Sequence, residues 1–127
     1  MLLKQILLVG LGGGIGSIFR YLVSVFTYSR IDKECLTFPL PTLVVNLLGC
    51  FLIGVLIGLT EKHASFDEQM KLFLITGFCG GFTTFSAFSL ENMHLYLSGH
   101  YFSLIVYILS SVLLGILLVW SGVFIVK

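Results

Sequence analysis

Four long apolar runs, separated by short polar stretches, form the pattern of the sequence. The runs cover about residues 2–28, 39–60, 72–97 and 101–126. Each is close to the ~20 apolar residues with which a helix crosses the hydrocarbon of a bilayer. The runs lack the alternation of apolar and polar positions that is typical of lipid-facing β-strands. We therefore expect an all-α integral membrane protein with four transmembrane helices in one domain, residues 1–127.

The polar stretches between the runs bear on orientation. If all four helices span, the N terminus, the loop at 61–71 and the C terminus share one side of the membrane. That side carries Lys4, Lys62, Lys71 and Lys127, and the opposite side carries Arg30, Lys33 and, where its side chain reaches the interface, Arg20. Because this difference is a weak positive-inside bias, one fixed orientation and insertion in both orientations, which would permit an antiparallel dimer, remain open.

The composition supports lipid as the solvent for this chain. Hydrophobic residues make up 57% and charged residues 10% of the sequence, and the mean hydropathy is +1.09. An ordinary globular domain has roughly 25% charged residues. The lysines and arginines do not cluster, so nothing indicates nucleic-acid binding. The phosphate-binding pattern GxxxxGKS or GxxxxGKT is absent, which argues against a nucleotide as partner. Cys35, Cys50 and Cys79 lack CxxC spacing and are expected to be small apolar fillers.

Glycines gather in the first run, from Gly10 to Gly16. Their spacing does not match the dinucleotide pattern GxGxxG. Instead, Gly12 and Gly16 form a GxxxG pair, as do Gly54 and Gly58 in the second run. Small residues at this spacing let two membrane helices approach closely, so we interpret both pairs as packing sites.

The third run contains an unusual stretch, Gly80-Gly81-Phe82-Thr83-Thr84. Glycine and β-branched residues both lower helix propensity. We therefore expect the third helix to be broken at mid-membrane, although close helix packing is the simpler alternative. Broken backbone is tolerated in a membrane where protein buries it or where it lines a cavity. Carbonyls freed at such a break can hold a cation, and half-helix N-termini favour anions.

Several side chains near this stretch could contact an ion. Phe85 and Phe88 are three residues apart and share a helix face. The edges of their rings are positive and could stabilise an anion, although lipid or core contacts also explain them. Asn46 could join two helices through a hydrogen bond or offer a donor to a pore. Arg20 must snorkel, pair or line a wet vestibule that attracts anions. Glu91 is expected to cap its helix or to pair with Arg20.

The fourth run has a polar track of its own. Ser110 and Ser111 interrupt an aliphatic stretch, and Tyr107 and Gly115 lie one turn to either side of Ser111. Helix packing and a polar path are both consistent with this pattern.

Three motifs together resemble the Fluc (CrcB-type) fluoride channels over nearly the whole chain. They are the glycine cluster leading to Arg20-Tyr21, the Pro41-Thr42-Leu43-x-x-Asn46-x-x-Gly49 start of the second run, and Gly80-Gly81-x-Thr83-Thr84-Phe85-Ser86-x-Phe88. Ala87 stands where the family motif commonly has threonine, so we expect no polar role there. The correspondence is looser in the fourth run, where Ser110 and Ser111 are partly interchangeable.

The resemblance implies a passive channel that exports fluoride across a bacterial inner membrane and so prevents its toxic accumulation. It implies an antiparallel homodimer with two pores, inserted in both orientations. Arg20 would serve the vestibule, and a structural sodium ion would be held by the carbonyls of Gly80 and Thr83 from both subunits. The ion path would be lined by Phe85, Phe88, Asn46, Thr84, Ser86, Tyr107, Ser111 and Ser110.

Two other classes of function are alternatives. A small proton-coupled exporter of cationic drugs needs a titratable carboxylate inside the membrane. The first two runs contain no Asp or Glu, and Glu91 lies near the end of the third. An accessory subunit without transport activity would explain the packing glycines, but not Asn46 or the expected break. No catalytic nucleophile is visible, so we expect no enzymatic activity.

Overall fold

The structure, a computed structural model, describes residues 1–32 and 37–127. All regular elements in these two segments are helical: α1 (Leu2–Arg30), α2 (Leu40–Lys62), α3 (Glu68–Lys71), η2 (Leu72–Cys79), α4 (Gly80–Phe82), α5 (Phe85–Leu97) and α6 (Tyr101–Val126). Four helical segments are long and apolar enough to cross a membrane, with α3 to α5 forming the third. This confirms the four expected helices. Lys33, Glu34 and Cys35, which entered the sequence analysis, lie outside the described residues.

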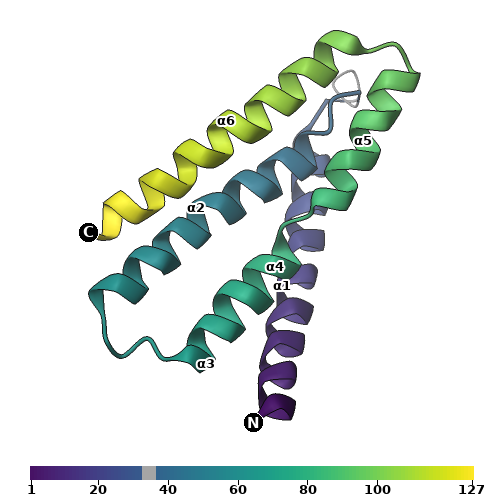
Figure 1. Cartoon of the computed structure of the whole chain (residues 1–127). Helices are drawn as coiled ribbons and strands as arrows, with labels where there is room; N and C mark the ends of the chain where they lie inside the picture. The colour runs from purple at the N-terminus through teal and green to yellow at the C-terminus, as the bar shows by residue number, and fades with distance from the viewer. Residues whose placement is uncertain (33–36) are drawn as a thin grey trace.

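The helices α2 and α6 lie side by side along most of their lengths (Figure 1). Their backbones approach closely because glycines lie at the contact. A Cβ atom on Gly54 would come within 2.2 Å of the Val119 carbonyl oxygen, and one on Gly122 within 2.4 Å of the Phe51 carbonyl oxygen. Gly58 faces Val123 in the same way. The packing role predicted for Gly54 and Gly58 is confirmed.

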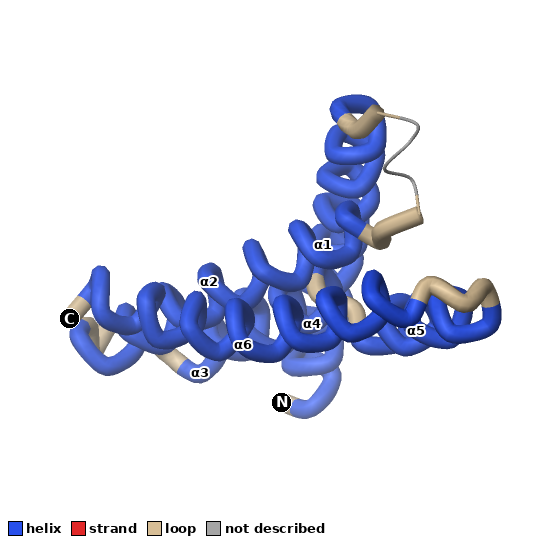
Figure 2. The backbone as a smooth tube through the Cα atoms, turned by 90° about the horizontal axis from the view of Figure 1, so that it is seen from above, coloured by secondary structure: helices blue, strands red, loops and turns tan. Residues whose placement is uncertain are grey.

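The first helix, α1, packs on the third membrane segment and diverges from the other helices at its C-terminal end (Figure 2). Gly12 and Gly16 are buried at this contact. A Cβ atom on Gly12 would collide with the Phe73 carbonyl oxygen, and one on Gly16 with the Phe78 carbonyl oxygen. The packing role predicted for this second GxxxG pair is also confirmed.

The third segment changes its backbone conformation several times along its length. It is π-helical over Leu72–Cys79, continues as the short α4, and resumes as α5 at Phe85. Between α4 and α5 the backbone is extended, with φ −84° and ψ 159° at Thr83 and φ −148° and ψ 120° at Thr84. The Thr84 hydroxyl oxygen accepts a hydrogen bond from the Ala87 amide and so caps the N-terminus of α5.

Much of the apolar surface is not covered by the chain itself. In α1 and α6 only 11% of the most apolar window is buried. The buried hydrophobic core is correspondingly small and consists of Leu43, Val45, Leu56, Cys79, Phe82, Leu95 and Tyr107. A soluble monomer rarely exposes apolar surface of this extent, so lipid or another protein chain must cover it.

Candidate functional site

The extended backbone between α4 and α5 is held by a side chain of α2. The Asn46 amide nitrogen donates to the Thr84 carbonyl oxygen at 3.0 Å, and the Asn46 amide oxygen accepts from the Thr84 N–H at 2.8 Å. Asn46 and Thr84 were expected in one site from the sequence, but not as hydrogen-bond partners of each other. The interruption leaves the Thr84 N–H without its helical acceptor, and the Asn46 amide oxygen replaces that acceptor.

A cavity of about 480 Å³ lies beside this pair, between α2, the third segment and α6. No residue that lines it is charged. The lining residues are Asn46, Gly49, Cys50, Ile53, Ile75, Thr76, Cys79, Gly80, Thr83, Thr84, Phe85, Phe88, Ser111 and Val112. The structure thus brings together most of the predicted site residues. Thr76 was not expected at the site from the sequence, although it lies one helical turn before the conspicuous Gly80-Gly81 pair.

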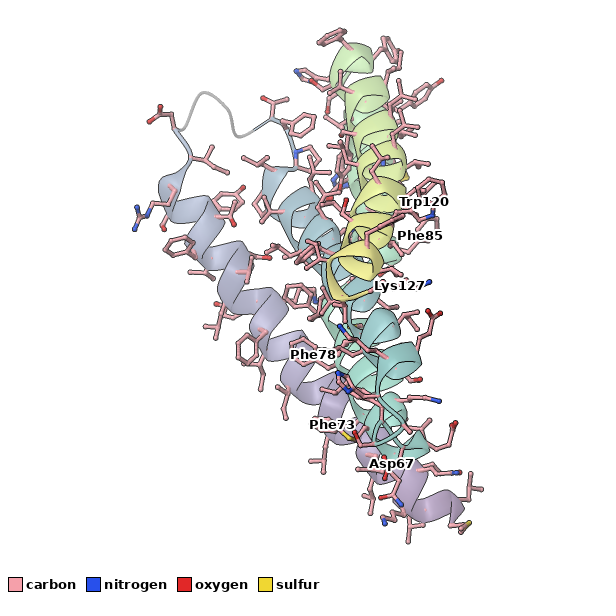
Figure 3. The ribbon with its side chains drawn as sticks, turned by 90° about the vertical axis from the view of Figure 1, so that its left-hand side faces the viewer. Asp67, Phe73, Phe78, Phe85, Trp120 and Lys127 are labelled. Atoms are coloured by element: carbon pink, nitrogen blue, oxygen red, sulfur yellow. The ribbon has the colours of Figure 1, made fainter. Side chains whose placement is uncertain are left out.

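The two phenylalanines of the site lie next to each other, with ring centroids 5.8 Å apart and planes inclined by 37°. Phe88 also contacts Tyr107, at a centroid distance of 5.0 Å. Phe85 is 79% exposed and projects away from α1, whereas Phe78 lies on the side that faces α1 (Figure 3). The Phe85 ring is therefore largely free to contact an ion, lipid or another chain.

The two serines of α6 differ in their surroundings. The Ser110 hydroxyl donates to the Tyr107 carbonyl within its own helix, at 3.3 Å. Ser111 lines the cavity, and its buried hydroxyl oxygen has no hydrogen-bond partner among residues 1–32 and 37–127. A buried hydroxyl without a partner is costly, so Ser111 is available to a guest in the cavity.

Glu91 lies between α2 and α6. Its carboxylate accepts hydrogen bonds from the Thr42 and Tyr107 hydroxyls, both at 2.6 Å. The expected pairing of Glu91 with Arg20 is wrong: the ion pairs of the described segments are Lys71–Glu68 and Lys127–Glu61. Nor does Glu91 cap its helix, because it lies within α5 and its carboxylate bonds to side chains of other helices. Thr42, which follows Pro39 and Pro41 at the start of α2, was not expected from the sequence as a partner of Glu91.

The remaining predicted residues lie around this centre. Arg20 is half-buried on α1 and does not line the cavity. The Ser86 hydroxyl lies 3.4 Å from that of Thr84. Glu91 and Thr42 border a second cavity of about 550 Å³, which His94 and His100 also line.

Two backbone carbonyls at the interruption have lost their usual helical donors. In an α-helix the Thr84 N–H would donate to the Gly80 carbonyl and the Ala87 N–H to the Thr83 carbonyl. These two amides donate instead to the Asn46 amide oxygen and to the Thr84 hydroxyl oxygen. Both carbonyl-bearing residues line the cavity. Carbonyl oxygens are hard donors that suit sodium, so this pair fits the expected cation ligands.

Four long apolar helical segments, three of which line an uncharged cavity, define a small multi-pass membrane protein. Residues 7–123 match the family model described as CrcB-like protein, Camphor Resistance (CrcB). This chain belongs to the CrcB family, as the resemblance of its motifs indicated.

Curated relatives match nearly the whole chain. A protein of Azobacteroides pseudotrichonymphae is 54% identical over 95% of this chain and 94% of its own length. One of Flavobacterium psychrophilum is 44% identical over 98% of both chains, and one of Methylobacillus flagellatus is 46% identical over 97% and 94%. All three are named fluoride-specific ion channel FluC, a name that describes no enzyme. The chain is a multi-pass protein of a bacterial membrane.

Proposed function

We propose that this protein is a passive fluoride-selective channel of the bacterial inner membrane, which lets fluoride leave the cell before it reaches toxic concentrations. The observation that carries this proposal is the 44–54% identity, over nearly the full chain, to proteins named as fluoride-specific channels. The chemistry of the cavity agrees with it. Conduction requires binding that is favourable enough for entry but weak enough for exit, and amide, hydroxyl and ring-edge donors bind an anion without the hold of a full charge.

The proposed ion path follows the polar side of the cavity. Phe85 and Phe88 present their positive ring edges to the anion. Asn46 has one amide hydrogen to spare after its bond to Thr84, because a side-chain amide carries two. The Ser111 hydroxyl, which is buried and without a partner, can turn its proton toward fluoride. Thr84, Ser86, Tyr107 and Ser110 lie along or beside the path, and Arg20 draws anions into the vestibule.

The functional unit in this proposal is an antiparallel homodimer with two pores, assembled from copies inserted in both orientations. The exposed apolar faces of α1 and α6 and the weak difference in basic residues between the two sides support it. The exposed Phe85 ring, on the edge of an open cavity, suggests that a second chain completes the wall. The extended Thr83–Thr84 backbone would then lie at mid-membrane between two chains, where neither peptide faces lipid.

A structural sodium ion would join the two subunits. Its proposed ligands are the Gly80 and Thr83 carbonyls of both chains, whose usual amide donors bond elsewhere. One chain supplies two such oxygens, which are too few for a sodium site, so the partner's pair is required. The bound ion would neutralise converging carbonyl dipoles and hold the interruption in place.

Fluoride efflux from liposomes tests the proposed function. Purified protein is reconstituted into vesicles loaded with fluoride or with chloride, and ion release is followed with selective electrodes. Rapid loss of fluoride without loss of chloride is expected. An absence of fluoride flux from folded dimer would contradict the proposal, and exchange of cationic drugs for protons around Glu91 would then be measured.

A further inference from the structure

Asn46 of α2 bonds to both backbone groups of one residue in the third segment. Its amide nitrogen donates to the Thr84 carbonyl oxygen and its amide oxygen accepts from the Thr84 N–H, at 3.0 and 2.8 Å. A side-chain amide can make this pair because it carries donors and an acceptor at one end. Since the two Thr84 groups need opposite partners, they also determine which way the amide is turned.

The Thr84 N–H that donates to Asn46 is the group that would continue the helix from α4. In an uninterrupted α-helix the Thr84 N–H donates to the Gly80 carbonyl, four residues earlier. With Asn46 in place that N–H is used, and the Gly80 carbonyl is left without it. The Thr83 carbonyl loses its own donor differently, because the Ala87 N–H bonds to the Thr84 hydroxyl oxygen. Only the Gly80 carbonyl therefore depends on Asn46.

We propose that Asn46 is a positioning residue for the cation site, which it serves by holding the Thr84 N–H away from the Gly80 carbonyl. This inference rests on the sodium site of the proposed function. It gives Asn46 two tasks. One amide hydrogen and the amide oxygen hold the interruption open, and the second amide hydrogen is left for a guest in the cavity that Asn46 lines. Cation binding and the anion path are then linked through one side chain.

The test is the sodium dependence of thermal unfolding, measured on the full-length dimer in detergent after exchange into choline chloride. Asn46→Leu keeps the size of the side chain but removes its hydrogen bonds. The sodium concentration that gives half of the full stabilisation should rise about tenfold in this variant, the change expected from losing the one bond that holds the Thr84 N–H. Asn46→Gln keeps the amide but displaces it by one methylene, and it should give an intermediate rise. This second variant also serves if Asn46→Leu does not fold.

Ser111→Ala is the matched control, because Ser111 lines the same cavity and makes no bond to Thr84. It should lower fluoride flux. It should leave unchanged the sodium midpoint, which is the sodium concentration that gives half of the full stabilisation. A sodium midpoint that stays the same in both Asn46 variants, with fluoride flux lost, would overturn the inference and leave Asn46 as an anion donor only. Wild-type protein whose stability does not depend on sodium would overturn it together with the cation site. Fluoride efflux of the wild type separately decides whether the protein is a channel.

Discussion

The α2–α6 pair and the third membrane segment differ in whether their helices are continuous. The helices α2 and α6 are continuous over Leu40–Lys62 and Tyr101–Val126, so their backbone hydrogen bonds are made within each helix. The third segment is π-helical, then α-helical, then extended at Thr83 and Thr84 before α5 begins. There the backbone takes its partners from Asn46 and from its own threonine side chains.

The difference separates scaffold from site. Continuous helices with glycines at their contact need only van der Waals packing to stay together in lipid. An interrupted helix exposes peptide groups that lipid cannot satisfy, and it persists only where protein or a cavity receives them. The uncharged cavity lies at the interruption.

The largest effect is expected where the scaffold is tightest. Gly54→Val would put a side chain within 2.2 Å of the Val119 carbonyl oxygen. Overpacking at a backbone contact should destabilise the protein by about 3 kcal/mol or more, measured as loss of monodisperse protein and a lower Tm in detergent. Gly10→Val is the control, because a Cβ there meets nothing within 4 Å. Equal Tm values for the two variants would contradict the close approach of α2 and α6.

Tyr107→Phe tests the link between the two regions. The Tyr107 hydroxyl of α6 donates to the Glu91 carboxylate of α5 at 2.6 Å, and Tyr107 is fully buried. Loss of a hydrogen bond to a carboxylate should destabilise the protein by about 2 kcal/mol, measured by thermal unfolding. The control is Tyr101→Phe, whose side chain is 56% exposed and whose removal of a hydroxyl should have little effect. A similar loss in both variants would mean that the bond to Glu91 contributes nothing specific.

Thr84→Val examines the interruption itself. The substitution removes the hydroxyl that accepts from the Ala87 N–H at 3.2 Å. We expect a loss of about 1 kcal/mol in the free energy of unfolding, the usual value for a helix N-cap, and its recovery in Thr84→Ser. Thr60→Val is the comparison within the scaffold, because that hydroxyl only donates to a carbonyl of its own helix. If the two valine variants behave alike, the cap has no special role.

The smallest effect is expected at the ends of the scaffold. Lys127 and Glu61 form an ion pair at 3.1 Å, with side chains 58% and 54% exposed. Lys127→Gln should change the unfolding free energy by at most about 0.5 kcal/mol, since exposed pairs are screened. Tm measured at low and high salt should show that even this difference disappears at high salt. A large, salt-independent loss would show that the pair does more than join two helix ends.

Most of the fold could be predicted from local patterns in the sequence. The four apolar runs have the length of membrane spans, and the GxxxG pairs at Gly12 and Gly54 need only their own spacing to indicate packing. Long-range contacts were harder to predict. Glu91 bonds to Thr42 and Tyr107 from other helices, whereas its sequence position suggested Arg20 or a cap. Which serine of α6 faces the cavity depends on helix rotation, which two adjacent serines do not reveal.

The interruption was only partly predictable, for a physical reason. The Gly80-Gly81 and Thr83-Thr84 pairs have low helix propensity, and this located the change in backbone. The π-helical turns of Leu72–Cys79 have no comparable signal, because an apolar run is compatible with either helix type. The two hydrogen bonds between Asn46 and the Thr84 backbone depend on how α2 packs against the third segment. No spacing within the sequence encodes that packing.

Fluoride efflux from liposomes, compared between Phe85→Ile and Phe124→Ile, most directly tests whether the interrupted segment carries the ion. The two phenylalanines are almost equally exposed, at 79% and 78%, so each substitution removes little packing within the chain. We expect fluoride flux to fall by about tenfold or more in Phe85→Ile, because the ring edge is lost from the path, and to be unchanged in Phe124→Ile on the continuous α6. Equal flux in both variants, or a loss confined to Phe124→Ile, would contradict the placement of the ion path along the third segment.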